Sequence, residues 1–189
     1  MCVGDQTVEP ILRKALAIGA DNAIRINYTP EDSYSTAKEI ANHVKSSEYD
    51  LIIAGKESSD YNSGAVPGML ADMLNIPFVN ACNGLTINND TIQLSREIDG
   101  GIENLESKMP LIIGGQKGLV EESELKIPNM RGIMTARTKP LEVIEASEKT
   151  TLIESIEFEK PPVKGNCKMI DENNITDLVN ELHNVAKVI

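Results

Sequence analysis

The chain has 189 residues, 41% of them hydrophobic, and a formal net charge of −11, which fits one globular domain with an extension. The acidic balance argues against a nucleic-acid groove and against docking on an anionic membrane, because both partners attract clustered cations. In addition, no apolar run is long enough to span a bilayer. Three widely spaced cysteines without a CxxC motif argue against a disulfide framework or a zinc site and favour a reducing, cytoplasmic compartment.

The first 82 residues alternate between extended and helical patterns. The strand patterns lie at 2–4, 23–27, 49–55 and 78–82, and the helical patterns at 6–18, 33–47 and 66–74. Thr7 and Ser33 are the candidate N-caps of the first two helices, and Gly19 is a stop signal. This alternation predicts an α/β fold, with a parallel, doubly wound sheet that is covered by helices on both faces.

The pattern changes after Cys82. Two turn signals, at 88–90 and 99–101, predict hairpins between antiparallel strands at 84–87, 91–98, 102–107 and 111–114. Residues 115–140 are expected to be irregular, residues 141–173 an extended arm, and the last segment a helix capped by Asn174. The chain is therefore expected to divide into an α/β domain, 1–140, and a C-terminal arm with a helix, 141–189. Whether that helix packs on its own domain or on another protein is left open by its narrow apolar stripe.

A long polar loop follows the buried strand at 49–55. In an open parallel sheet, ligands bind beyond the carboxyl ends of the strands. Gly55 allows close approach to the backbone there, and the helix that begins near Val66 offers free N–H groups and a positive dipole end, which suit phosphate. Lys56 adds a positive charge, the loop serines add hydroxyls, and Glu57 or Asp60 has an acceptor for a ribose hydroxyl. The loop therefore predicts a nucleotide site, although GxGxxG and GxxxxGK[ST] are absent; the alternative is a solvated connection.

No catalytic constellation emerges from the remaining motifs. His43 and His183 are expected to be surface residues, and Asp99 is best explained by a turn with the two glycines that follow it. The residues alone thus predict a binding protein without acid–base chemistry.

Four ordered stretches resemble the β subunit of electron transfer flavoproteins. They are RKALAIGADNAIRI (13–26), DLIIAGKESSDYN (50–62), REIDGGIENLESKMPLII (96–113) and IPNMRGIMTARTKPLEVIE (127–145). Together with the terminal DLVNELHNVAKVI (177–189), the resemblance covers essentially the whole chain in order. It implies an adenine nucleotide α-hydrolase-like sheet with an antiparallel extension, and a C-terminal arm and helix that dock on an α subunit.

The resemblance also implies cofactors and partners. The β subunit holds a structural AMP, and the α subunit holds most of the site for the redox-active FAD. The αβ heterodimer takes electrons from acyl-CoA dehydrogenases, as in fatty acid oxidation, or from other dehydrogenases, and passes them to a quinone oxidoreductase or another acceptor. One alternative is a bifurcating flavoprotein with a second redox-active FAD in the β site, and another is a stand-alone nucleotide-binding module of the universal-stress type.

The resemblance assigns the nucleotide site and the docking loop to particular positions. The docking loop corresponds to 116–126, where Leu119 matches an apolar anchor that is expected to be exposed. Departures from the family pattern are Ala65 in place of Gln, Pro67 in place of Gly, Leu94 in place of a small β-branched residue or Gly, and Gly114 in place of Ala, Cys, Ser or Thr. The chain also opens at the family's second strand, so the sheet's central first strand is expected to be absent. The nucleotide-contacting positions are Val3, Gly4, Gly55, Lys56, Glu57, Ser58, Ser59, Asp60, Tyr61, Asn62, Ser63, Gly64, Ala65 and Val66.

Overall fold

The computed structural model describes residues 1–147 and 150–189. It contains two compact units, Met1–Ser155 and Ile156–Ile189. The first unit extends past the predicted boundary after residue 140, because β8 (Leu141–Glu145) pairs with an N-terminal strand instead of lying in an extended arm.

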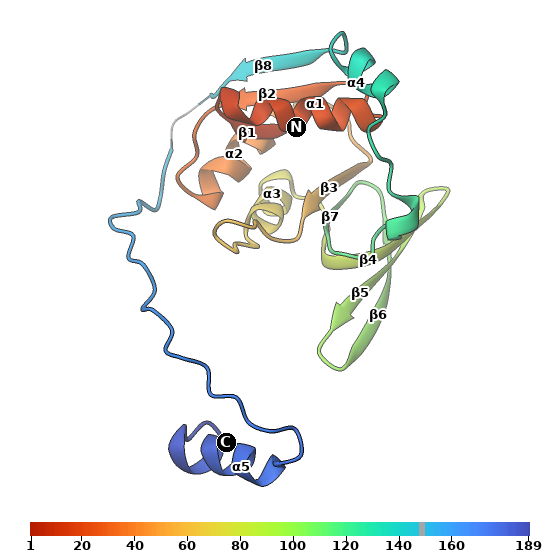
Figure 1. Cartoon of the computed structure of the whole chain (residues 1–189). Helices are drawn as coiled ribbons and strands as arrows, with labels where there is room; N and C mark the ends of the chain where they lie inside the picture. Colours follow the sequence, from red (N-terminus) through yellow and green to blue (C-terminus); the bar gives the residue numbers. More distant parts are fainter. Residues whose placement is uncertain (148–149) are drawn as a thin grey trace. The chain divides into compact units, whose positions relative to one another are not determined.

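Two open sheets build the first unit (Figure 1). The smaller sheet has the order β1-β2-β8 and is parallel throughout. Its strands are β1 (Cys2–Gly4), β2 (Ala23–Asn27) and β8. In the register, Ile26 of β2 lies opposite Val3 on one side and Ile144 on the other.

The larger sheet is mixed and has the order β3-β7-β4-β5-β6. Its strands are β3 (Leu51–Gly55), β7 (Leu111–Gly115), β4 (Phe78–Asn88), β5 (Thr91–Ile98) and β6 (Gly101–Lys108). β7 is parallel to both β3 and β4, whereas β5 is antiparallel to both β4 and β6. Leu111 and Ile113 belong to one core cluster and Ile112 to another, as strand alternation requires, so both faces of β7 are buried.

Among the described residues of the first unit, four helices pack in pairs. α1 (Glu9–Ile18), after the 3-10 turn η1 (Gln6–Val8), contacts α4 (Met130–Ala136), and α2 (Ser33–Val44) contacts α3 (Val66–Leu74). In α1, Leu12 and Leu16 pack with Ala23 and Ala136 beside the smaller sheet. In α2 and α3, Ala37, Ala41 and Leu70 pack on Ile112 of the larger sheet. A further 3-10 turn, η2 (Glu122–Glu124), precedes α4.

The α/β class with parallel pairs and an antiparallel extension is confirmed, but one strand direction is wrong. The segment at 111–114 was expected to continue the hairpins, yet β7 is parallel to both of its neighbours. Its unbroken apolar run is typical of a strand that is buried on both faces in a parallel pair. The turn signals before this segment indicate where the chain reverses, but they act locally and do not determine which strand the segment pairs with.

Two predicted caps and one predicted loop are also corrected. Asp5 caps the 3-10 turn in place of Thr7, and Asp32 caps α2 in place of Ser33, because each carboxylate accepts a backbone N–H two or three residues on. Residues 115–140 are not wholly irregular: α4 begins there, capped by Asn129, which accepts from Gly132 N at 2.7 Å.

The second unit is extended up to the terminal helix. α5 (Ile175–Asn180) continues into a π-helical turn, Glu181–Val185. The predicted cap is confirmed, because the Asn174 side chain accepts from Asp177 N at 3.3 Å. In the part of the chain that the structure describes, no helix has the length and apolar character needed to cross a membrane.

Candidate functional site

The predicted loop joins β3 to α3 and is anchored at its first residue. Lys56 N donates to Gly115 O of β7 at 3.0 Å, which fixes the loop to the carboxyl end of the parallel pair. A Cβ built on Gly55 would meet only Glu57 O, at 3.8 Å. The backbone at this strand end is therefore open to an approaching group, as the sequence predicted.

The tip of the loop closes on itself. Ser58 N donates to Ser63 O at 3.0 Å, and Ser63 N donates to the Ser58 hydroxyl at 3.3 Å. Asn62 sits between them with φ 54°, a left-handed conformation that asparagine tolerates. The two serines thus shape the turn, and Tyr61 at its tip is exposed.

One carboxylate in the loop is held in its charged form. The Ser58 hydroxyl and then the Tyr61 N–H hydrogen-bond to Asp60, and together they lower the pKa of that carboxyl below its ordinary value of 3.8. The Tyr61 N–H lies 2.7 Å from Asp60 Oδ1. Asp60 is therefore an acceptor at neutral pH, as a ribose contact requires, although one of its oxygens already serves the loop.

The start of α3 leaves donors available at the end of the loop. Ala65 precedes the helix without a side-chain cap, and Pro67 occupies its first turn. The first-turn N–H groups have no intrahelical partner and the positive end of the dipole lies there, so an anion is favoured. The Ser33 hydroxyl at the start of α2 lies 3.0 Å from the Ser63 hydroxyl, which links the start of α2 to the loop that precedes α3.

A hollow of about 500 Å³ lies beside this loop. It follows β3 from Leu51 to Gly55, and Met1, directly before β1, and Ile24 of β2 also line it. β1 and β3 are both edge strands, and Val66 of α3 closes one side. The structure thus brings the two ends of the predicted loop, Gly55 and Val66, to one hollow with both polar and apolar lining residues.

The other two predicted contacts, Val3 and Gly4, lie on β1. Gly4 O accepts from Arg25 Nη1 at 3.1 Å, and a Cβ on Gly4 would lie 2.7 Å from Val8 Cγ1. A larger residue at Gly4 would therefore collide with the Val8 side chain. Among the described residues no hydrogen bond links Val3 or Gly4 to the Gly55 loop, and only Met1 of this end of the chain lines the same hollow.

Sequence reasoning missed a contact between the start of α2 and residues 152–153, a segment called the strap below. Asp32 Oδ2 accepts from Leu152 N at 2.7 Å and from Ile153 N at 3.0 Å, while Oδ1 caps the helix at Ser35 N. Burial tends to raise the pKa of Asp32, but the hydrogen bonds from Ser35, Leu152 and Ile153 hold it below 3.8. An aspartate directly before a helical pattern is a capping signal, but its second role depends on residues 120 positions away.

The anchor of the predicted docking loop is not exposed as expected. Leu119 is half-buried and packs against the core cluster of the larger sheet, with its Cδ2 3.2 Å from the Cβ position of Gly115. The exposed apolar side chains of the loop are instead Val120, 51% accessible, and Leu125, 56% accessible. A leucine beside glycines can turn inward, and local sequence does not reveal that choice.

Gly114 has a structural explanation. A Cβ at this position would lie 2.4 Å from Asn80 Oδ1, so the asparagine side chain fills the space that a larger residue would need. Asn80 Oδ1 is buried, and within the described residues it has no hydrogen-bond partner. The two residues therefore form a matched pair near the start of β4 and the carboxyl end of β7.

Two comparisons with known proteins show which family the chain resembles. The family model described as the electron transfer flavoprotein domain matches residues 1–149. The chain is 33% identical to the electron transfer flavoprotein subunit beta of Bacillus subtilis, covering 99% of this chain and 77% of that protein. Proteins of the same name are 31% identical in Syntrophomonas wolfei, over 100% of this chain and 75% of theirs, and 27% identical in Homo sapiens, over 98% and 74%.

Proposed function

The chain belongs to the electron transfer flavoprotein β-subunit family, and we propose that it works as the β subunit of an αβ electron carrier that holds AMP at the Gly55–Val66 loop. The observation that carries the nucleotide assignment is the uncapped start of α3 at the end of an open loop. Such a helix start favours a phosphate group through its free N–H groups and its dipole.

The residues present fit a nucleotide at each of its parts. Lys56 and the first turn of α3 suit the phosphate, and the Asp60 carboxylate suits a ribose hydroxyl. The hollow beside Ile52 and Val66 offers apolar walls for a base. The chain contributes binding and orientation at this site, whereas the electron chemistry is supplied by the FAD that the α subunit mainly holds.

Two variants of the αβ complex test the AMP site. Lys56→Ala removes the loop's cation, and we expect AMP affinity to fall about tenfold, the effect of one lost charge-assisted contact. Lys108→Ala removes an exposed lysine at the far end of β6 and is the matched control. Bound AMP is counted by mass spectrometry after denaturation, and equal AMP retention in both variants would contradict the assignment.

Counting flavins in the same preparation separates the alternatives. One FAD and one AMP per αβ pair support the simple carrier, whereas two FAD molecules identify a bifurcating protein with a second flavin in the β site. A chain that binds ATP tightly and never associates with an α subunit is a stand-alone module of the universal-stress type. We also propose that the αβ complex docks acyl-CoA dehydrogenases or other dehydrogenases and passes their electrons to a quinone oxidoreductase or another acceptor.

The docking loop gives a separate test of partner recognition. Because Val120 is exposed and Leu119 is half-buried, Val120→Ala should slow electron transfer from a dehydrogenase without lowering stability. Leu119→Ala should lower stability as well, because it removes core contacts. Reduction of the bound flavin by the dehydrogenase is followed by absorbance, and an unchanged rate in both variants argues against docking at this loop.

A further inference from the structure

We propose that nucleotide binding at the Gly55–Val66 loop and closure of the strap on α2 favour each other. The strap is closed when the backbone N–H groups of Leu152 and Ile153 donate to Asp32. The proposal rests on the proposed function, since it assigns a regulatory role to the same AMP site. The feature that supports it is the start of α2, residues 32–35, which contacts the loop and the strap at once.

A pair of hydroxyl groups joins this stretch to the loop. Ser33 Oγ lies 3.0 Å from Ser63 Oγ, and the contact is partly buried. Ser63 is itself fixed to the opposite side of the loop, because its backbone O accepts from Ser58 N at 3.0 Å and its backbone N donates to Ser58 Oγ at 3.3 Å. A ligand that holds the loop in this turn therefore also holds the hydroxyl that reaches α2.

The strap is held by the residue directly before Ser33. Asp32 Oδ1 accepts from Ser35 N at 2.7 Å, and Asp32 Oδ2 accepts from Leu152 N at 2.7 Å and from Ile153 N at 3.0 Å. Both oxygens of one carboxylate are in use, so a shift at the start of α2 that turns this side chain disturbs the helix cap and the strap together. The stretch 32–35 thus connects the two contacts through adjacent residues.

The strap has little apolar packing to hold it closed. Leu152 and Ile153 are 65% and 70% accessible. Directly before them, Thr151 Oγ1 lies 3.4 Å from Tyr28 Oη, a long contact. A segment with exposed side chains and a few hydrogen bonds opens at a low free-energy cost, without unfolding of the domain. The strap is therefore a two-state element, and a ligand that favours its closed state shifts its population.

Nucleotide and strap act in the same direction because both need the same conformation at the start of α2. A bound nucleotide restricts the loop, keeps Ser63 against Ser33 and so keeps the Asp32 carboxylate facing the strap. A closed strap holds the same helix start in the position that the loop contacts. By linkage, the factor by which AMP favours strap closure equals the factor by which strap closure raises the affinity for AMP.

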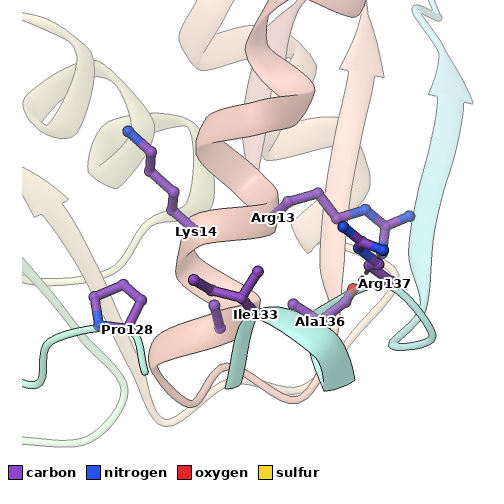
Figure 2. A pocket seen from close by; sticks show the side chains of 7 residues that line it. Arg13, Lys14, Pro128, Ile133, Ala136 and Arg137 are labelled. Atoms are coloured by element: carbon purple, nitrogen blue, oxygen red, sulfur yellow. Dashed lines mark hydrogen bonds between the residues drawn. The ribbon is translucent and has the colours of Figure 1, made fainter. Parts of the chain in front are cut away.

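A separate groove offers a control for the place where AMP binds. It lies between α1 and α4, and Figure 2 shows that Ile133 and Pro128 line it together with the cations Arg13, Lys14 and Arg137. These cations attract a phosphate as well. None of the groove's described lining residues belongs to the loop, to the start of α2 or to the strap. AMP bound in this groove would therefore leave the strap unchanged.

The test is hydrogen exchange at the Leu152 and Ile153 amides of the αβ complex, without AMP and at saturating AMP. We expect AMP to slow exchange at both amides about fivefold, the effect of about one hydrogen bond. Ser33→Ala removes the hydroxyl that meets Ser63 and should abolish the slowing. Ser95→Ala is the matched control, because it removes a hydroxyl that donates to Asn83 Oδ1 at 2.9 Å in the larger sheet, and it should keep the slowing.

The reverse effect is measured as AMP affinity. Asp32→Asn keeps one acceptor oxygen and loosens the strap, so its affinity for AMP should fall about threefold. Arg137→Ala, in the α1–α4 groove, should leave the affinity within about twofold. A larger loss in Arg137→Ala than in Asp32→Asn would place the nucleotide in the groove and overturn the proposal.

Bound AMP is counted by mass spectrometry in the same samples, which separates failure of the coupling from failure of the AMP site. Bound AMP with unchanged exchange at both amides overturns the coupling and leaves the AMP site standing. Equal slowing in Ser33→Ala and in the unaltered complex overturns the route through Ser33. A complex that retains no AMP refutes the AMP site, and the coupling with it.

Discussion

Replacing Asp32 should both weaken α2 and release the strap that crosses its start. In Asp32→Ala the helix loses its cap at Ser35 N, and Leu152 N and Ile153 N lose their acceptor. An N-cap contributes about 1 kcal/mol. The two strap bonds add about 1 kcal/mol together, because Leu152 and Ile153 are 65% and 70% accessible and water replaces part of each bond. The free energy of unfolding should therefore fall by about 2 kcal/mol.

A second variant separates the two roles of the carboxylate. Asparagine keeps one acceptor oxygen, so Asp32→Asn should retain the cap and lose part of the strap, with a loss of about 1 kcal/mol. Urea unfolding gives the stability, and hydrogen exchange at Leu152 and Ile153 reports the strap. Asp21→Ala, a change of an exposed aspartate, is the control. A loss below about 0.5 kcal/mol in Asp32→Ala, or unchanged exchange at both amides, would refute the reasoning.

The pH dependence gives an independent check. The folded pKa of Asp32 lies below the ordinary value of 3.8, so its stabilising contribution is fully present above that value. The contribution is lost as the pH falls from 3.8 through the lower folded pKa. The unaltered chain should therefore lose more stability across this acid range than Asp32→Asn does. Parallel acid dependences of the two proteins would show that the carboxylate charge contributes nothing.

Three further changes follow from single contacts. Gly132→Ala should cost at least about 2 kcal/mol in urea unfolding, because its Cβ would lie 2.4 Å from an α1 backbone oxygen, whereas Gly101→Ala, with no atom within 4 Å, should be nearly neutral; equal losses would contradict the close packing. Arg25→Met should cost about 2 kcal/mol in the same assay. The change leaves the Glu9 carboxylate, which is 30% accessible, and the oxygens Gly4 O and Asn27 Oδ1 without their donor. An unchanged midpoint of urea unfolding would show that these three contacts are dispensable. Burial raises the pKa of the Cys82 thiol, so a thiol reagent followed by mass spectrometry should label exposed Cys167 first; early labelling of Cys82 would argue against a closed core.

Most regular elements near the candidate site were predictable because their signals are local. The strand at 23–27 and the helix at 66–74 match the observed bounds, since β-branched alternation and a first-turn proline act over a few residues. The open Gly55 and the uncapped start of α3 follow from the same kind of signal. The four ordered motifs added the family, which the comparisons confirm over nearly the whole chain.

Contacts between distant segments decided the remainder. The parallel direction of β7, the pairing of β8 with β2, and the inward turn of Leu119 each depend on a neighbour far along the chain. A turn signal fixes where the backbone reverses, but it does not say which strand edge the next segment will meet. Hydrogen-bonding partners in a sheet are selected by burial on both faces, which exists only once the layers have assembled.

The sequence by itself determined the α/β class, the polar loop after β3 and the absence of a catalytic motif, because these follow from periodicity, composition and residue chemistry. Only the tertiary structure decided that Asp32 serves two segments, that Asn80 occupies the space above Gly114, and that an apolar groove with a cationic rim forms between α1 and α4. Each of these features joins residues that are separated by tens of positions or more. Their proximity is set by packing, which no local pattern records.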